Sequence, residues 1–388
     1  MNDASFTIRP GEDPLPGAGL AETSFAVLPW RAWDSAQARS VWDALSARAG
    51  TPNPFFEPWY LLAGLARFDP QERICIAALM RGNVPEALVP VQRARRYGRH
   101  PLPHLAVWLH ANAFLGAPLV AAGAEEAFWE ALLDWADRHA GTAAFFHIAA
   151  LPLENVLAEA LLAVGARQRR QVVLVHREER AMLTSPLGPA AYLEHALPGK
   201  KRKELRRQQA RLAEQGALAL LRRHDMDGIE AWIEHFLALE ARGWKGSAGS
   251  ALACAGETAG LFRESMTAAA ERGCLERLSL ELDGAPIAML ATLITPPGAF
   301  SYKTTFDERF ARFSPGVLLQ LENLALLERP DVRWADSCAA PDHPMIDSLW
   351  RERRVIGRFS IAIGGTARRA LFRRIVALEM SRNPQGLA

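Results

Sequence analysis

A serine, a proline and a glycine at residues 314–316 separate an apolar stretch that ends at Phe306 from a leucine-rich stretch. Serine is favoured immediately before a helix, and proline at the first helical position. The start of a helix carries unpaired backbone N–H groups and the positive end of the dipole, so it can hold an anion. Gly316 would let a ligand approach the backbone, and Arg309 and Arg312 would add charge for a pyrophosphate. An ordinary capped helix with two solvated arginines explains the same residues.

The elements around this segment decide which chemistry it could perform. Residues 275–295 form two apolar runs joined at Asp283-Gly284, a strong hairpin signal, and residues 299–306 predict a third strand. The helix that opens at Ser314 would run to residue 328, and a further strand is expected over 332–340. Three segments before the hairpin have helical patterns: 199–215, 229–244 and 257–273. The anion-ready helix start therefore lies between two strands of one sheet.

The first half of the chain has the same order of elements. Glu72 opens "ERICIAALMRGNVPEALVP" and Glu276 opens "ERLSLELDGAPIAMLAT"; both run from a strand through a glycine turn to a proline, Pro85 or Pro286. This echo predicts two copies of one α/β fold in tandem. The predicted units are a tail over 1–22, an N-terminal domain over 23–180, a C-terminal catalytic domain over 181–365 and a basic C-terminal helix or tail over 366–388.

Composition limits the function classes. The chain has 388 residues, 49% of them hydrophobic, and a formal net charge of +2. That length predicts two domains, and the small net charge argues against a DNA-binding protein. The sequence has no apolar run of about 18 residues, so we expect no membrane span. The four cysteines lie far apart, so we expect reduced thiols in the cytoplasm, without metal or disulfides.

The ordered segments of the second half resemble the GNAT superfamily of acyl-CoA N-acyltransferases, in its CelD-like or Fem-like branch with tandem GNAT domains. The similar segments are "KKRKELRRQQARL", "FLALEARGWKGSAGSAL", "LELDGAPIAMLATL" and "FDERFARFSPG", within about residues 182–360. The pyrophosphate loop of GNAT proteins is usually richer in glycine. Many relatives also carry a Tyr-Lys-x-x-Trp motif after the last core strand, where this chain keeps only Trp350. The resemblance implies a mixed α/β sheet and transfer of an acetyl or other acyl group from CoA to an amine.

The resemblance also implies a set of site residues. Backbone groups of the 312–317 segment would hold the pyrophosphate, and the implied cofactor-binding residues are Arg309, Arg312, Phe313, Ser314, Pro315, Gly316 and Val317. Asp336 is the first candidate for the base and His343 the second, while Ser337, Cys338 or water could serve as the acid. Candidate acceptor-site residues are Trp244, Lys245, Tyr302 and Lys303. Because side chains alternate along a strand, only one of Tyr302 and Lys303 should face the site.

The basic segment 199–215 predicts an amphipathic helix. Its basic stripe consists of Lys200, Lys203, Arg207 and Arg211, with Leu205 and Leu212 on the buried side. No aromatic residue accompanies the stripe, which favours a solvated face over a nucleic-acid site. A Fem-like enzyme that takes an aminoacyl group from transfer RNA, for cell-envelope work, is the first alternative, and a non-catalytic scaffold is the second. The basic C-terminal segment could touch an acidic membrane surface or pack on the domain.

Overall fold

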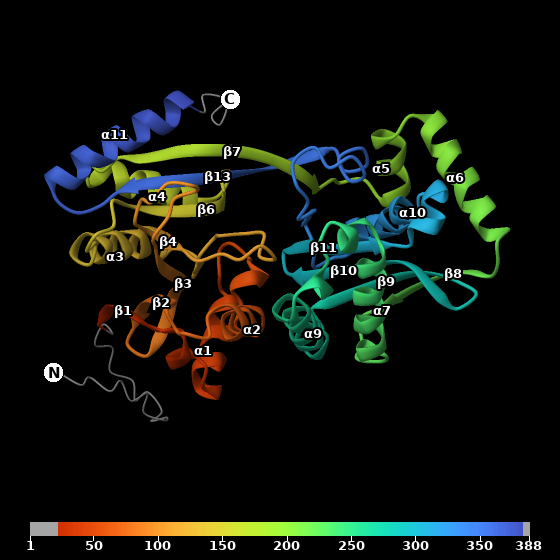
Figure 1. Cartoon of the computed structure of the whole chain (residues 1–388), viewed down its shortest axis with the longest axis horizontal. Helices are drawn as coiled ribbons and strands as arrows, with labels where there is room; N and C mark the ends of the chain where they lie inside the picture. Colours follow the sequence, from red (N-terminus) through yellow and green to blue (C-terminus); the bar gives the residue numbers. More distant parts are fainter. Residues whose placement is uncertain (1–21, 383–388) are drawn as a thin grey trace.

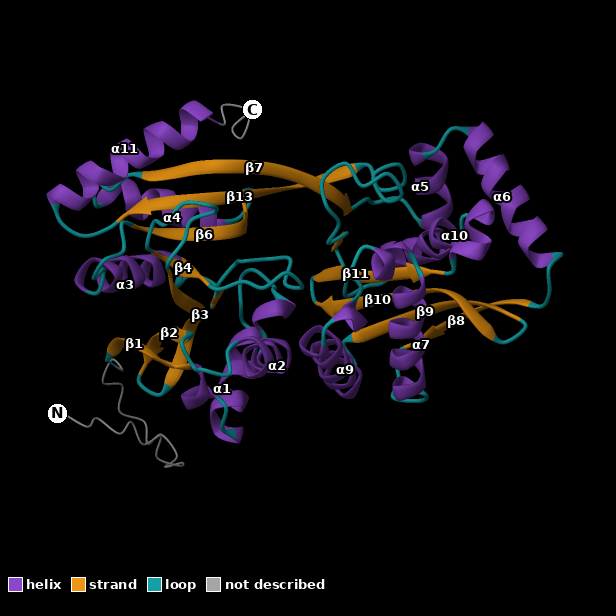
Figure 2. Cartoon of the chain, in the orientation of Figure 1, coloured by secondary structure: helices purple, strands orange, loops and turns teal. Residues whose placement is uncertain are grey.

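The computed structural model describes residues 22–382, and its strands form one mixed sheet (Figures 1 and 2). The strand order is β1-β2-β3-β4-β6-β13-β7-β12-β11-β10-β9-β8, with β5 beside β3. The predicted tail over residues 1–22 lies outside the described residues except for its last position, as do residues 383–388 of the predicted C-terminal segment. Within residues 22–382, no helix has both the length and the apolar character needed to cross a bilayer.

The first half follows the predicted order of helices and strands. Its elements are β1 (Thr23–Pro29), α1 (Ala36–Ser46), α2 (Pro58–Phe68), β2 (Cys75–Arg81), β3 (Val84–Ala94), β4 (His104–Val107), β5 (Leu119–Val120), α3 (Glu125–Arg138), β6 (Phe145–Pro152) and α4 (Val156–Arg167). Ser35 begins α1 as expected, because its side chain accepts a hydrogen bond from the Ala38 N–H at 3.1 Å.

From β8 (Leu218–Arg223) onward the second half repeats this order: apart from the short β5 and α8 (Trp244–Ser247), both halves run through a strand, two helices, three strands, a helix and a strand. Its elements are β7 (Val172–Leu183), α5 (Pro189–Ala196), α6 (Gly199–Ala213), β8 (Leu218–Arg223), α7 (Ile229–Arg242), α8 (Trp244–Ser247), α9 (Gly256–Glu271), β9 (Leu275–Leu282), β10 (Ala285–Thr295), β11 (Gly298–Phe306), α10 (Pro315–Glu322), β12 (Trp334–Asp336), β13 (Glu352–Ala362) and α11 (Thr366–Arg382). Short 3-10 turns are η1 (Trp30–Trp33), η2 (Pro54–Phe56), η3 (Leu252–Cys254), η4 (Glu308–Phe313) and η5 (Asn323–Glu328).

The two predicted hairpins share an irregularity. In β2–β3 the register slips just after Pro85, and in β9–β10 it slips just after Pro286. Asp283 and Gly284 both have positive φ, as a tight two-residue hairpin turn requires. Each half also contains one parallel strand pair, β4 with β6 and β11 with β12. The predicted α/β fold with a mixed sheet is therefore confirmed, and the two halves share the same hairpin and parallel-pair arrangement.

The C-terminal elements join the two halves. Strand β13 pairs antiparallel with both β6 and β7, and the far end of β7 pairs with β12. Helix α11 lies along β7 and β13 (Figure 1). Its buried Phe372 packs against Phe145 of β6. The sheet is continuous past residue 180, so the domain boundary there stays a prediction. The buried side of the basic helix α11 packs on the first half of the chain, which is one of the two expected roles of this segment.

Helices α2 and α9 pack against each other between the two halves (Figure 1). Arg67 of α2 donates a hydrogen bond to Glu264 of α9 at 2.8 Å, and Arg272 lies 3.2 Å from Asp43 of α1. One hydrophobic core extends through both halves and includes Phe55 and Phe300. This interface fixes residues of the first half next to β11, where the candidate site lies.

Candidate functional site

A bulge in β11 sets the geometry of the candidate site. Lys303 pairs with Ala291 of β10 and Ser301 pairs with Thr292, which leaves Tyr302 as an extra residue. The Lys303 Nζ atom lies 5.7 Å from the centre of the Tyr302 ring, so both side chains face the same side of the sheet. The prediction that only one of them faces the site is wrong, because regular strand alternation stops at the bulge.

The first half supplies the opposite wall of this site. The Tyr60 and Tyr302 hydroxyl oxygens lie 3.0 Å apart, and the Tyr60 hydroxyl donates to the Asn112 carbonyl at 2.5 Å. The Lys303 Nζ atom lies 5.2 Å from the centre of the Phe114 ring. His110 stacks on Tyr60 at 5.8 Å between ring centres. Sequence reasoning missed these first-half residues, because nothing near them in the chain indicates a contact with β11.

Burial controls the protonation of this cluster. Removal from water, and then the nearby charge of Lys245, lower the pKa of Lys303 to about 8. Burial, and then the charge of Lys303, lower the pKa of His110 to about 4. Burial raises the pKa of both Tyr60 and Tyr302, so their hydroxyls stay protonated. Lys303 is therefore the group in this cluster that changes charge near neutral pH.

Lys245 lies beside the cluster but is held by other groups. Its ammonium donates to Glu240 at 2.8 Å and to the Thr304 carbonyl at 3.2 Å. The second Glu240 oxygen accepts the Leu252 N–H at 2.8 Å. Lys245 thus ties α8 to β11. Trp244, its neighbour, is 58% exposed, so its side chain is not part of the core, and its place in the acceptor site stays a prediction.

Another segment covers the start of α10, where the sequence predicted a pyrophosphate cradle. Strands β11 and β12 pair only from Gly298 to Phe300, so beyond Phe300 β11 keeps β10 on one side and has no β12 partner on the other. Ser314 precedes α10 with a φ of 54° and makes no side-chain cap, contrary to the sequence prediction. Gly316 is buried, and a β-carbon there would lie 3.2 Å from the Met345 sulfur. A ligand at this backbone therefore requires the loop around Met345 to move.

The predicted cradle arginines are engaged elsewhere. Arg309 is paired with Asp307 at 2.6 Å and its side chain is 77% exposed. The Arg312 guanidinium lies 4.6 Å from the ring centre of its neighbour Phe313, which is buried. Pro315 is also buried, and the Val317 N–H donates to the Ser314 carbonyl. Both arginines precede the start of α10 in the chain, but their side chains contact Asp307 and Phe313.

Asp336 is a structural carboxylate rather than an available base. It is fully buried and accepts hydrogen bonds from Arg180 at 2.6 Å and from Arg354 at 2.8 Å. Burial alone would raise its pKa, but the two guanidinium groups outweigh burial and lower it. An ionised carboxylate with two arginine partners is a weak proton acceptor, so the predicted base role does not fit this geometry.

The other predicted acid and base candidates lie after β12. The Ser337 hydroxyl accepts the Ala339 N–H at 3.3 Å, and burial followed by the charge of Asp336 raises the pKa of the Cys338 thiol. Among residues 22–382, His343 has a buried Nδ1 without a hydrogen-bond partner. Within the same described range, no three His, Cys, Asp or Glu side chains are grouped as a metal site.

Comparisons with known proteins agree with this architecture. Residues 199–343 match the family model described as an acetyltransferase (GNAT) domain. FemX has 11% identity and a TM-score of 0.55, with 87% of this chain and 98% of FemX covered. A conserved protein of unknown function from Bacteroides thetaiotaomicron has 13% identity and a TM-score of 0.53 over 84% of this chain and 97% of that one. No curated protein matches the sequence.

A third solved structure has the same fold. It is described as the C-terminal domain of a lysylphosphatidylglycerol synthetase from Agrobacterium fabrum, with 12% identity and a TM-score of 0.51 over 89% of this chain and 97% of that domain. Residues 199–343 thus form a GNAT domain. The chain as a whole shares its fold with FemX, which is the fold that the resemblance predicted.

Proposed function

We propose that this protein is an N-acyltransferase that moves an acyl group from a CoA thioester to an amine, with Lys303 at the reacting centre. The observation that carries the proposal is the placement of Lys303. The bulge turns it toward Tyr302, and Phe114 of the first half lies against it. The acceptor would enter between the two halves, and the first half would shape its site.

The proposed reaction is a direct attack of the acceptor nitrogen on the thioester carbonyl. A C–N bond forms as the C–S bond breaks, and the departing thiolate takes up the proton that the amine releases. Negative charge develops on the carbonyl oxygen in between. The Lys303 ammonium would stabilise that oxygen, and an aligned donor in a water-poor site contributes about 3 kcal/mol to such a step. Ser337, His343 and water remain candidates for passing protons at the mouth of the site.

The thioester arm would run along β11 where β12 no longer pairs with it. The pyrophosphate would then reach the 314–317 segment at the start of α10, once the loop around Met345 has moved. We keep Arg309 and Arg312 as proposed cradle residues, since a bound phosphate could draw their exposed side chains inward. All four cysteines are free, and a cytoplasmic location, where acyl-CoA is found, belongs to the same proposal.

An aminoacyl-tRNA donor is the second candidate, and α6 favours it. The helix packs against η4, next to the proposed cradle, and buries Leu205 and Leu212 as predicted. Its exposed basic residues are Lys200, Lys201, Lys203, Arg206, Arg207 and Arg211. A basic strip beside the donor site suits the acceptor end of a transfer RNA. A cell-envelope amine would be the matching acceptor under this reading.

Calorimetric titration with two donors separates these readings. Acetyl-CoA and free CoA are titrated into the wild type and into Gly316→Trp, and charged transfer RNA is titrated at two salt concentrations. Micromolar CoA binding that Gly316→Trp abolishes supports the acyl-CoA proposal. Salt-sensitive RNA binding without CoA binding replaces it with the second candidate. Binding of neither donor to the folded protein rejects both and leaves the non-catalytic scaffold.

A further inference from the structure

Strand β9 carries polar residues on a face where a packed core is expected. Arg277, Ser279 and Glu281 alternate along the strand and point toward α7, while Leu278, Leu280 and Leu282 enter the core on the other face. A strand face covered by a helix is normally apolar, because buried polar groups lose hydration. The row therefore has to be explained by what lies between β9 and α7.

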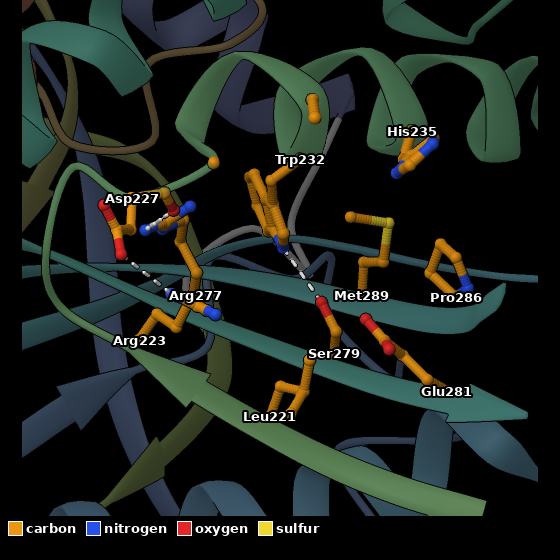
Figure 3. Close-up of a pocket in the computed structure, with 12 residues that line it drawn as sticks. Leu221, Arg223, Asp227, Trp232, His235, Arg277, Ser279, Glu281, Pro286 and Met289 are labelled. Carbon is orange, nitrogen blue, oxygen red and sulfur yellow. Dashed lines mark hydrogen bonds and ion pairs between the residues drawn. The ribbon is translucent and has the colours of Figure 1, made fainter. Parts of the chain in front are cut away.

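A cavity of about 290 Å³ lies there (Figure 3). Trp232 and His235 project into it from α7, and Met289 lines its floor from β10. The Trp232 Nε1–H donates to the Ser279 hydroxyl at 3.0 Å, which fixes the ring across the middle of the cavity. This volume falls at the small end of the range for ligand sites.

One end of the cavity holds a buried positive group. Arg277 is 2% exposed, and its Nη2 donates to the Asp225 carbonyl at 2.7 Å and to the Asp227 carbonyl at 3.1 Å. Its Nη2 also lies 3.0 Å from the Asp225 carboxylate. The buried Nε–H of Arg277 has no acceptor among the described residues. A buried donor without a partner is costly, so this edge is suited to an anionic oxygen.

The other end is negative. Glu281 is half-buried, and within residues 22–382 its carboxylate makes no hydrogen bond or ion pair. His235 lies across from it on α7, and Met289 and Pro286 stand beside it (Figure 3). A carboxylate placed against apolar side chains attracts a cation more strongly than one in open water.

We infer that this cavity binds a small molecule with an anionic group at Arg277 and an ammonium group, several bonds away, at Glu281. The two residues are four positions apart in β9, so their Cα atoms are separated by about 13 Å. A linear ω-amino acid or a short peptide has this charge arrangement. The cavity lies over β8–β10 and Lys303 lies on β11, so the site is independent of the donor.

The test uses 6-aminohexanoate as the probe, with hexanoate and hexylamine as probes of one charge each. Calorimetry on the full chain should show 6-aminohexanoate binding at least about tenfold more tightly than either single-charge probe. Glu281→Gln should reduce its affinity to that of hexanoate and leave hexanoate unchanged. Glu230→Gln, on the exposed side of α7, is the matched control and should bind like the wild type.

A second variant tests the cavity itself and leaves Arg277 and Glu281 in place. Ala231 lines the cavity from the exposed side of α7, so Ala231→Trp should block it without disturbing the core. This variant should stay folded and lose binding of 6-aminohexanoate. The inference is overturned if the wild type binds the three probes equally or not at all, or if Glu281→Gln and Ala231→Trp bind 6-aminohexanoate as the wild type does.

Discussion

The hydroxyl oxygens of Tyr60 and Tyr302 lie 3.0 Å apart and connect α2 of the first half to β11 of the second. The Tyr60 hydroxyl also donates to the Asn112 carbonyl, so it receives the Tyr302 proton. This order predicts unequal costs. Tyr60→Phe leaves two buried groups without partners and should lower the free energy of unfolding by about 1–3 kcal/mol, whereas Tyr302→Phe should cost less than about 1 kcal/mol. Urea unfolding of both variants measures the difference, and equal costs would contradict it.

Asp336 should act as a structural group. Asp336→Asn leaves the Arg180 and Arg354 guanidinium groups buried without a charge partner, and should lower the free energy of unfolding by about 3–5 kcal/mol. Replacing all three, with Arg180→Met, Asp336→Leu and Arg354→Met, should recover much of that loss. Denaturant titrations test this. An Asp336→Asn protein as stable as the wild type but inactive would restore the base role.

Glu57 should make stability depend on pH. Burial raises its pKa from 4.5 to about 7, so between these values the folded protein keeps a proton that the unfolded chain releases. The free energy of unfolding therefore falls as pH rises from about 4.5 to 7, and the loss persists above 7. Glu57→Gln keeps an acceptor for the Trp59 N–H and removes this loss.

The Glu57→Gln variant should be more stable than the wild type at pH 8 by about 1–3 kcal/mol, the smaller figure allowing for partial exposure. At pH 4 the two proteins should be equally stable. Glu154→Gln is exposed and should show no such pH-dependent difference. A constant difference between Glu57→Gln and the wild type at both pH values would show that the carboxyl is not held neutral.

Met345 should limit access of CoA to the start of α10. Its sulfur lies against Gly316, so Met345→Ala should let the loop leave more easily and should tighten CoA binding by up to about tenfold. Arg351→Lys changes an exposed residue of the same loop, keeps its charge and should leave the affinity as it is. Weaker CoA binding by Met345→Ala would mean that the methionine contacts the ligand instead of covering its site.

Sequence patterns predicted what is encoded locally. Asp283-Gly284 predicted the hairpin turn, and Ser35 predicted the cap of α1. The echo around Pro85 and Pro286 predicted two copies of one fold, and the structure adds a register shift after each proline. Each of these signals depends on residues that are neighbours in the chain. The basic helix also followed its pattern, since Leu205 and Leu212 are buried.

The candidate site could be predicted only in part, because it depends on distant contacts. The bulge at Tyr302 changes the direction of the Lys303 side chain, and no residue near it in the sequence predicts a bulge. Arg180 and Arg354 reach Asp336 from two other strands, so the carboxylate that we expected to act as a base is held in ion pairs. Phe114 meets Lys303 only once the two halves have packed together.

The central claim is that Lys303 stabilises charge during acyl transfer, and thiol release from acetyl-CoA in the presence of an amine panel tests it most directly. Lys303→Met should lower kcat/KM by at least about a hundredfold while CoA affinity is unchanged, because a donor to the developing oxyanion is lost. Lys303→Arg keeps the charge and should retain more activity than Lys303→Met. A folded Lys303→Met protein that releases thiol as fast as the wild type would contradict the account.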